Sequence, residues 1–120
     1  MMRRIFVLFL LLASAGCQSM DMDIYTIDKI EMKDAREVGS KTIVSYETFM
    51  ESLYFSPGVR VQAQGDDLLL SAVRCQIKKS CDVDAKAVVE GAVSRVSVES
   101  PKGRIYWSDG KSKKAIEVAR

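Results

Sequence analysis

Hydrophobic and polar residues alternate with the two-residue period of β-strands over much of the second half of the chain. The alternation is strict at 59–63, and a second β-rich run at 68–75 follows the turn sequence Gly65-Asp66-Asp67. These two runs predict a β-hairpin. Further strands are predicted at 88–98, with Gly91 as a bulge or break, at 104–107 and at 115–118, with turns at 100–103 and at Asp109-Gly110.

A helical pattern is found at 46–55, where apolar residues recur every three or four positions. Ser45 suits the N-cap, and Ser56-Pro57-Gly58 ends the run. The pattern predicts a helix over 46–55 whose apolar stripe faces the core. The residues of this stripe are Tyr46, Phe49, Met50, Leu53 and Tyr54.

Three other segments complete the predicted fold. Residues 24–32 predict a first strand, and the charged residues 33–40 predict a loop that ends at Gly39-Ser40. Residues 82–90 fit either a strand or a short helix closed by Gly91, and the sequence leaves both open. The whole pattern predicts an α+β fold, a β-rich meander of six or seven short strands with one helix.

The first seventeen residues differ from the rest of the chain. Arg3 and Arg4 precede an uncharged apolar run at 5–13, and Ser14-Ala15-Gly16 precede Cys17. A helix of nine apolar residues is about 14 Å long, roughly half of a bilayer core. The segment therefore favours a cleaved secretory signal over a membrane span.

This arrangement resembles the signal peptide and lipobox of bacterial lipoproteins, although Ser14 stands where that class usually has a large aliphatic residue. The resemblance implies that residues 1–16 are removed and that Cys17 becomes the acylated N-terminus. It implies a lipidated tether at 17–23 and a single periplasmic domain at 24–120. Because Gln18 rather than aspartate follows the cysteine, the implied location is the periplasmic face of an outer membrane.

In that oxidising compartment, Cys75 and Cys81 are predicted to form a disulfide. A hairpin whose loop is 76–80 places the two cysteines opposite each other. The same register sorts apolar residues to one face and pairs Arg74 with Asp82 on the other. The expected partners on the apolar face are Val73 and Val83, Ser71 and Ala85, and Leu69 and Ala87.

Charge argues against a nucleic-acid partner. Without Arg3 and Arg4 the chain has 16 basic and 16 acidic residues, whereas nucleic-acid binding needs a basic surface. The charges are unevenly placed, because residues 17–67 carry an excess of five acids and residues 68–120 an excess of five bases. The two halves either neutralise each other in the folded domain or leave a basic face for an anionic partner.

The chain contains no histidine, which removes the commonest general base and metal ligand. The sequence therefore predicts no metal, no cofactor and no catalysis. The favoured function is a small outer-membrane lipoprotein that serves as a binding or accessory subunit of an envelope or secretion complex. The alternative is a hydrolase of peptidoglycan or another envelope polymer that uses carboxylates such as Glu47, Glu51 or Glu90.

The predicted partner-binding segment combines aromatic and basic side chains near the C-terminus. An arginine beside aromatic residues is typical of contacts with a protein or glycan partner. One of the two adjacent aromatic residues is expected to point into the core. The lysines have a second interpretation, the protection of an exposed sheet edge against strand addition. The candidate residues are Arg104, Tyr106, Trp107, Lys111, Lys113 and Lys114.

Overall fold

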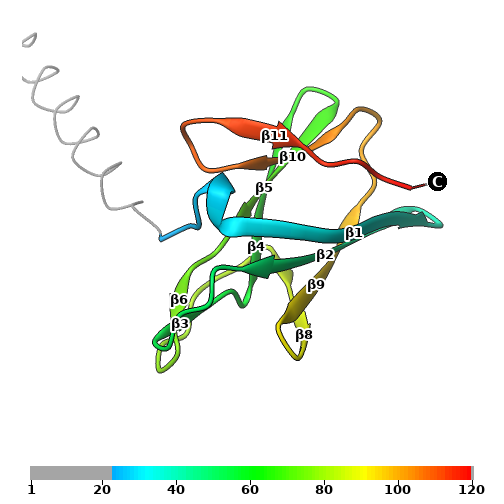
Figure 1. Ribbon diagram of the computed structural model, residues 1–120. Helices are drawn as coiled ribbons and strands as arrows, with labels where there is room; N and C mark the ends of the chain where they lie inside the picture. The colour runs from blue at the N-terminus through cyan, green and yellow to red at the C-terminus, as the bar shows by residue number, and fades with distance from the viewer. Residues whose placement is uncertain (1–22, 120) are drawn as a thin grey trace, which may run out of the picture.

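The computed structural model of the protein describes residues 23–119. The predicted leader, the lipidation site Cys17 and Arg120 lie outside the described residues. Within 23–119 the chain forms a 3-10 turn (Ile27–Lys29) and eleven strands in three sheets (Figure 1).

One large sheet has four strands in the order β1 (Ile30–Val38), β2 (Lys41–Thr48), β9 (Val93–Glu99) and β8 (Val88–Glu90). The other has five in the order β11 (Lys113–Ala115), β10 (Ile105–Ser108), β5 (Asp67–Ala72), β4 (Gly58–Gln64) and β7 (Ala85–Lys86). A small third sheet pairs β3 (Tyr54–Phe55) with β6 (Cys75–Gln76).

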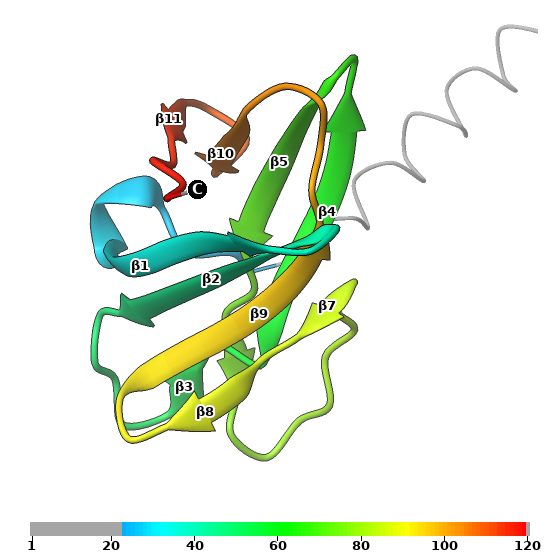
Figure 2. The ribbon, with the colours of Figure 1, turned by 90° about the vertical axis from the view of Figure 1, so that its right-hand side faces the viewer.

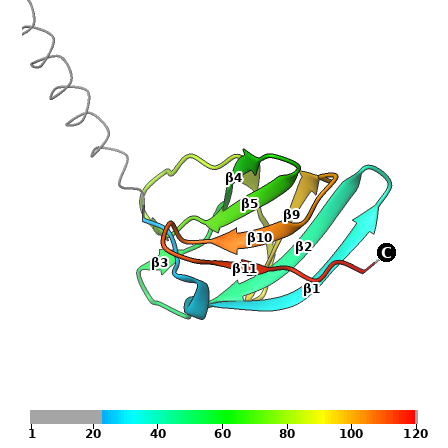
Figure 3. The same ribbon diagram turned by 90° about the horizontal axis from the view of Figure 1, so that it is seen from above.

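The two large sheets face each other, as Figures 2 and 3 show. Strand β10 pairs with β5 in parallel, while the other strand pairs are antiparallel. The C-terminal residues return to β1, where the amide of Ala119 donates to Ala35 O with an N···O distance of 2.8 Å. This contact joins the end of the chain to the edge strand of the four-stranded sheet.

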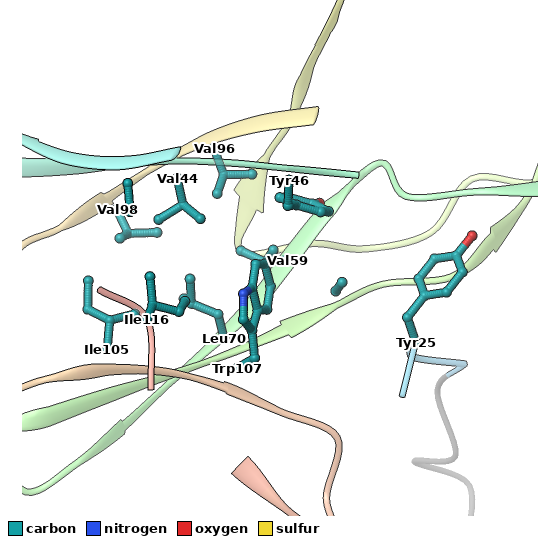
Figure 4. Close-up of a cluster of buried hydrophobic side chains, with 12 residues drawn as sticks. Tyr25, Val44, Tyr46, Val59, Leu70, Val96, Val98, Ile105, Trp107 and Ile116 are labelled. Atoms are coloured by element: carbon teal, nitrogen blue, oxygen red, sulfur yellow. The ribbon is translucent and has the colours of Figure 1, made fainter. Parts of the chain in front are cut away.

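The core lies between the sheets and is built by alternate residues of their strands (Figure 4). Trp107 from β10 and Tyr46 from β2 meet edge to face at its centre, with ring centroids 5.0 Å apart. The Tyr46 hydroxyl is hydrogen-bonded to Ser56 Oγ at 2.8 Å, and burial raises the pKa of Tyr46 to about 12. The aliphatic residues around this pair are Val44, Val59, Leu70, Val96, Val98, Ile105 and Ile116.

The predicted α+β class and the predicted helix at 46–55 are wrong. The described residues are mostly β, and their one helical element is the three-residue 3-10 turn. Tyr46 belongs to β2 and Tyr54 to β3, so strand pairing and burial of Tyr46 outweigh the helical spacing. Phe49, Met50 and Leu53, expected in the core, are exposed between these strands.

The expected loop at 33–40 and the meander are also wrong. Residues through Val38 belong to β1, and only Gly39 and Ser40 form the turn to β2. Gly39 has φ of +63°, a conformation that suits glycine. The charged residues of β1 lie on a strand because its outer face is solvated. The parallel pairing of β10 with β5 breaks the meander.

The two hairpin predictions at 59–75 and around Asp109-Gly110 are confirmed. Strands β4 and β5 pair antiparallel, with Val61 opposite Leu70, and Gly65 has φ of +62° in the turn between them. Strands β10 and β11 pair across residues 109–112. Residues 82–90 contain β7 and β8 and no helix, and Gly91 lies in the turn between β8 and β9.

The disulfide between Cys75 and Cys81 is present, with a Cα–Cα distance of 6.1 Å. The hairpin register used to predict it is wrong, because β7 pairs with β4 and β10 occupies the second edge of β5. Asp82 is not the partner of Arg74, whose guanidinium binds Glu51. The loop at 76–80 is closed by the disulfide and by β6, which pairs with β3.

Candidate functional site

The alternation of β10 separates the two aromatic residues of the predicted binding segment. Trp107 points into the core and is 2 % exposed, so it is a packing residue. Tyr106 lies on the outer face, opposite Leu69 of β5, and is half-buried. Arg104 is exposed just before β10, at the opposite end of the strand from the hairpin turn. The structure therefore brings Tyr106 together with Lys113, places Lys114 opposite Trp107 in the strand register, and leaves Arg104 apart.

The sequence-predicted lysines form a cationic edge, made of Tyr106, Lys111, Lys113 and Lys114, on the β10–β11 hairpin. The ammonium of Lys113 lies 4.7 Å from the centroid of the Tyr106 ring and 3.3 Å from Gln64 Oε1. All three lysines are exposed. Within residues 23–119 none of them takes part in an ion pair. Their charges are therefore available to an anionic partner.

Asp109 holds this hairpin turn in place. Its Oδ1 accepts hydrogen bonds from the backbone amides of Ser112 at 2.9 Å and Lys111 at 3.0 Å, and its Oδ2 accepts one from Ile27 at 3.2 Å. These amides favour the charged carboxylate and lower the pKa of Asp109. The turn that carries the lysines is thus tied to the 3-10 turn at the start of the domain.

A second surface, which sequence reasoning missed, lies at the other end of the sandwich. This apolar end consists of Phe49, Met50, Leu53 and Ile77, which are 58 %, 81 %, 64 % and 57 % exposed. The first three come from the segment between β2 and β3, and Ile77 follows β6. The amide of Ile77 donates to Leu53 O at 2.9 Å, which joins the two segments. In Figure 1, β3 and β6 lie at the bottom and β11 at the top.

Arg74 anchors this end of the domain. Its guanidinium makes two hydrogen bonds to the carboxylate of Glu51, at 2.7 Å and 2.9 Å, and lies 3.6 Å from the centroid of the Tyr54 ring. The pairing lowers the pKa of Glu51 and raises the pKa of Arg74. The Arg74 amide also donates to Asp23 O at 2.9 Å. Arg74 therefore connects the start of the described chain to the segment that carries the exposed apolar residues.

A groove of about 590 Å³ opens beside the apolar end, between β8 and the segment that includes β3. Two of the three glutamates considered for catalysis, Glu47 and Glu51, line it. The Glu47 carboxylate forms an ion pair with the Lys33 ammonium, and the Glu51 carboxylate forms one with the Arg74 guanidinium, each with an N···O distance of 2.7 Å. The third, Glu90, is exposed and pairs with Arg95 at 2.9 Å. All three carboxylates are thus held by cations.

Among residues 23–119, no group of three or more His, Cys, Asp and Glu side chains is placed to hold a metal ion. The same residues contain no helix that is long and apolar enough to cross a membrane. Comparisons with protein-family models, with curated proteins and with solved structures found no match. The two surfaces on the domain therefore carry the functional interpretation.

Proposed function

We propose that the protein is a lipid-anchored, non-catalytic binding subunit of the bacterial outer membrane, held at the periplasmic face through Cys17. Its partner is an anionic envelope component, a protein or a glycan, that binds the cationic edge. The observation that carries this proposal is the exposed β10–β11 hairpin, which carries three lysines without ion pairs in the described range, one of them, Lys113, over the ring of Tyr106.

The ion pairs elsewhere in the domain strengthen this choice. Four cations of the four-stranded sheet are each paired with a carboxylate. They are Lys33, Arg36, Lys41 and Arg95. Pairing reduces the field that such a side chain presents to a distant partner. The lysines of the cationic edge keep their field, so this edge attracts anions more strongly than the paired sheet does.

The ion pairs formed by the three candidate glutamates do not favour the hydrolase alternative. A general acid in glycoside hydrolysis needs a carboxyl group whose pKa is raised. Arg74 lowers the pKa of Glu51 instead. Glu47 and Glu90 are engaged in ion pairs with Lys33 and Arg95. The geometry thus supports binding rather than acid catalysis.

Substitution of the three lysines tests the proposed binding surface. The triple variant Lys111→Gln, Lys113→Gln, Lys114→Gln should bind isolated peptidoglycan or detergent-solubilised envelope complexes more weakly. Each lysine near an anionic surface contributes about 1 kcal/mol, or roughly fivefold in affinity, and salt screens the effect. The measurement is the dissociation constant as a function of salt concentration.

The matched control removes three exposed lysines from other places, with the substitutions Lys78→Gln, Lys79→Gln and Lys86→Gln. It loses the same charge, so it separates a local surface from net charge. A folded Lys111/Lys113/Lys114 variant with unchanged affinity and salt dependence for both materials would contradict the proposed site. The lysines would then serve only to protect the edge of the sheet.

A further inference from the structure

The apolar end lies where the chain enters the domain. The described chain starts at Asp23, whose carbonyl accepts from the Arg74 amide, and the next contact is between the Tyr25 amide and Ala72 O at 2.9 Å. Tyr25 is 3 % exposed, so its burial fixes this entrance. Arg74 then connects the entrance to Glu51 and Tyr54. The entrance and the apolar end are therefore parts of one fixed structure.

The length of chain before Asp23 limits how far this end can lie from a lipid at Cys17. Six residue steps separate Cys17 from Asp23. A fully extended chain spans at most about 3.3–3.6 Å per residue, so the maximum reach is about 20 Å. This is shorter than the thickness of a bilayer core. The start of the domain therefore stays next to the membrane surface in every orientation of the tether.

The side chains at this end suit a membrane surface. Leu53 and Ile77 are well exposed at neighbouring positions, and Lys78 and Lys79 follow Ile77 directly. Neither lysine forms an ion pair within residues 23–119. Exposed apolar residues flanked by lysines bury the apolar groups among lipid while the ammonium groups stay at the headgroups.

Two features adapt the end further to this role. The disulfide between Cys75 and Cys81 closes the loop that carries Ile77, Lys78 and Lys79, so less conformational entropy is lost when the loop docks. Of the acidic groups that line the groove, Glu47 and Glu51 are paired with Lys33 and Arg74. Asp82 is exposed beside Cys81 and forms no ion pair within residues 23–119, so the loop presents two free lysines against one free carboxylate.

We infer that the apolar end docks on the membrane leaflet that holds the Cys17 lipid, with Leu53 and Ile77 at the boundary between headgroups and acyl chains and with Lys78 and Lys79 against anionic headgroups. This inference rests on the proposed lipid anchor. The docking gives the domain a second, reversible contact with the membrane. Strand β11 lies toward the opposite end of the domain from β3 and β6 (Figure 1), while the β10–β11 turn stays tied to Ile27 near the entrance through Asp109.

Tryptophan placed at the apolar end reports the contact. Mature lipidated Leu53→Trp protein is reconstituted in vesicles of phosphatidylethanolamine and phosphatidylglycerol, with and without brominated lipid. Its added fluorescence should shift to shorter wavelength and be quenched by the brominated acyl chains. The control is Val38→Trp, because Val38 is 52 % exposed in the β1–β2 hairpin, away from β3 and β6 in Figure 1. The native Trp107 is buried, and wild-type protein supplies its background.

Equal emission and equal quenching of the two variants would overturn the inference. Floating the vesicles separates this failure from a failure of the anchor. Wild-type protein that does not float with the vesicles contradicts the anchor, and the inference falls with it. Protein that floats while the Leu53→Trp signal stays unquenched contradicts the docking alone.

Charge gives a second, independent readout. An unlipidated form of the mature chain, residues 17–120 with Cys17→Ser, should bind phosphatidylglycerol-containing vesicles better than vesicles of phosphatidylcholine alone. Adding Lys78→Gln and Lys79→Gln should weaken this binding by about fivefold per lysine. The control adds Lys86→Gln and Lys102→Gln instead, because these two exposed lysines belong to neither surface, and it should leave the binding unchanged. If Lys113→Gln and Lys114→Gln weaken the binding more than Lys78→Gln and Lys79→Gln do, the cationic edge is the surface that faces lipid and the inference is wrong.

Discussion

Arg74 organises its surroundings through a planar guanidinium that binds a carboxylate on its edge and an aromatic ring on its face. Glu51 takes the edge and Tyr54 the face. Only 30 % of the Arg74 side chain and 22 % of the Glu51 side chain are exposed. The pair is thus a fixed part of the structure rather than a solvated surface contact.

The pairing makes a prediction for the pH dependence of stability. The pKa of Glu51 is lowered from its ordinary value of 4.5, chiefly by the hydrogen bonds from Arg74. A group whose pKa is lower in the folded state stabilises the fold above its unfolded pKa and loses this effect as the pH falls through its folded pKa. Glu51→Gln should therefore lower the free energy of unfolding at neutral pH, and the difference from wild type should shrink as the solution is made acidic below 4.5.

Urea titrations across this range measure the effect. The control is Glu99→Gln, which removes a carboxylate that is 74 % exposed and pairs with Lys41. Exposed pairs contribute little, so the control should stay close to wild type throughout. A Glu51→Gln difference that is the same at neutral and at acidic pH would contradict the role given to the Arg74 pair.

At the scale of the element, the strands that were predicted correctly have local signals. The β4–β5 hairpin has strict alternation and a glycine turn, and the β10–β11 hairpin has Asp109-Gly110. The alternation of Thr42, Val44 and Tyr46 on the inner face of β2 was an equally local signal. The helical spacing of the apolar residues that follow concealed it. Three of those residues, Phe49, Met50 and Leu53, are exposed and belong to the apolar end rather than to the core.

Other parts of the fold have no local signal. The parallel pairing of β10 with β5 brings together residues more than thirty positions apart, with Ile105 opposite Leu68. No turn sequence records such a pairing. The same pairing removes the edge of β5 that the predicted second hairpin needed. The disulfide was still predictable, since it depends on compartment and cysteine count rather than on register.

The disulfide has a testable effect on stability. The double variant Cys75→Ser, Cys81→Ser should lower the free energy of unfolding by about 2 kcal/mol, because the bond closes a short loop and restricts the unfolded chain. Chemical denaturation of the double variant and of wild type, compared with wild type under reducing conditions, measures this. The reduced wild type should match the variant. Equal stability of oxidised wild type and the double variant would show that the bond adds nothing to the fold.

At the scale of the whole molecule, the sequence has an acidic first half and a basic second half, which were expected either to neutralise each other or to leave a basic face. The structure shows both outcomes. Arg74, between β5 and β6, pairs with Glu51, and Arg60 of β4 pairs with Asp84, so part of the charge is neutralised within the domain. The lysines of the cationic edge have no ion pair in the described range. Only the folded arrangement could distinguish these two groups of cations.

Lysines without ion pairs in the described range lie at both surfaces, the apolar end and the cationic edge. The apolar end and two free lysines lie at the end of the domain that carries β3 and β6, and β11 lies toward the other end (Figure 1). The chain enters between them, because Asp23 O accepts from the Arg74 amide and the Ile27 amide donates to Asp109 of the β10–β11 turn. In our proposal the first end contacts the membrane and the second end binds an anionic envelope component. The same proposal couples both surfaces to the position of the lipid through a short tether at 17–23.

The anchor at Cys17 is the claim on which this account depends most, and metabolic labelling with a fatty-acid analogue tests it most directly. Wild-type protein should take up the label, lose residues 1–16 and fractionate with the outer membrane. Cys17→Ser should remain unlabelled and accumulate as an unprocessed or soluble form, while Cys75→Ser/Cys81→Ser should label like wild type. Equal labelling of wild type and Cys17→Ser would contradict the account.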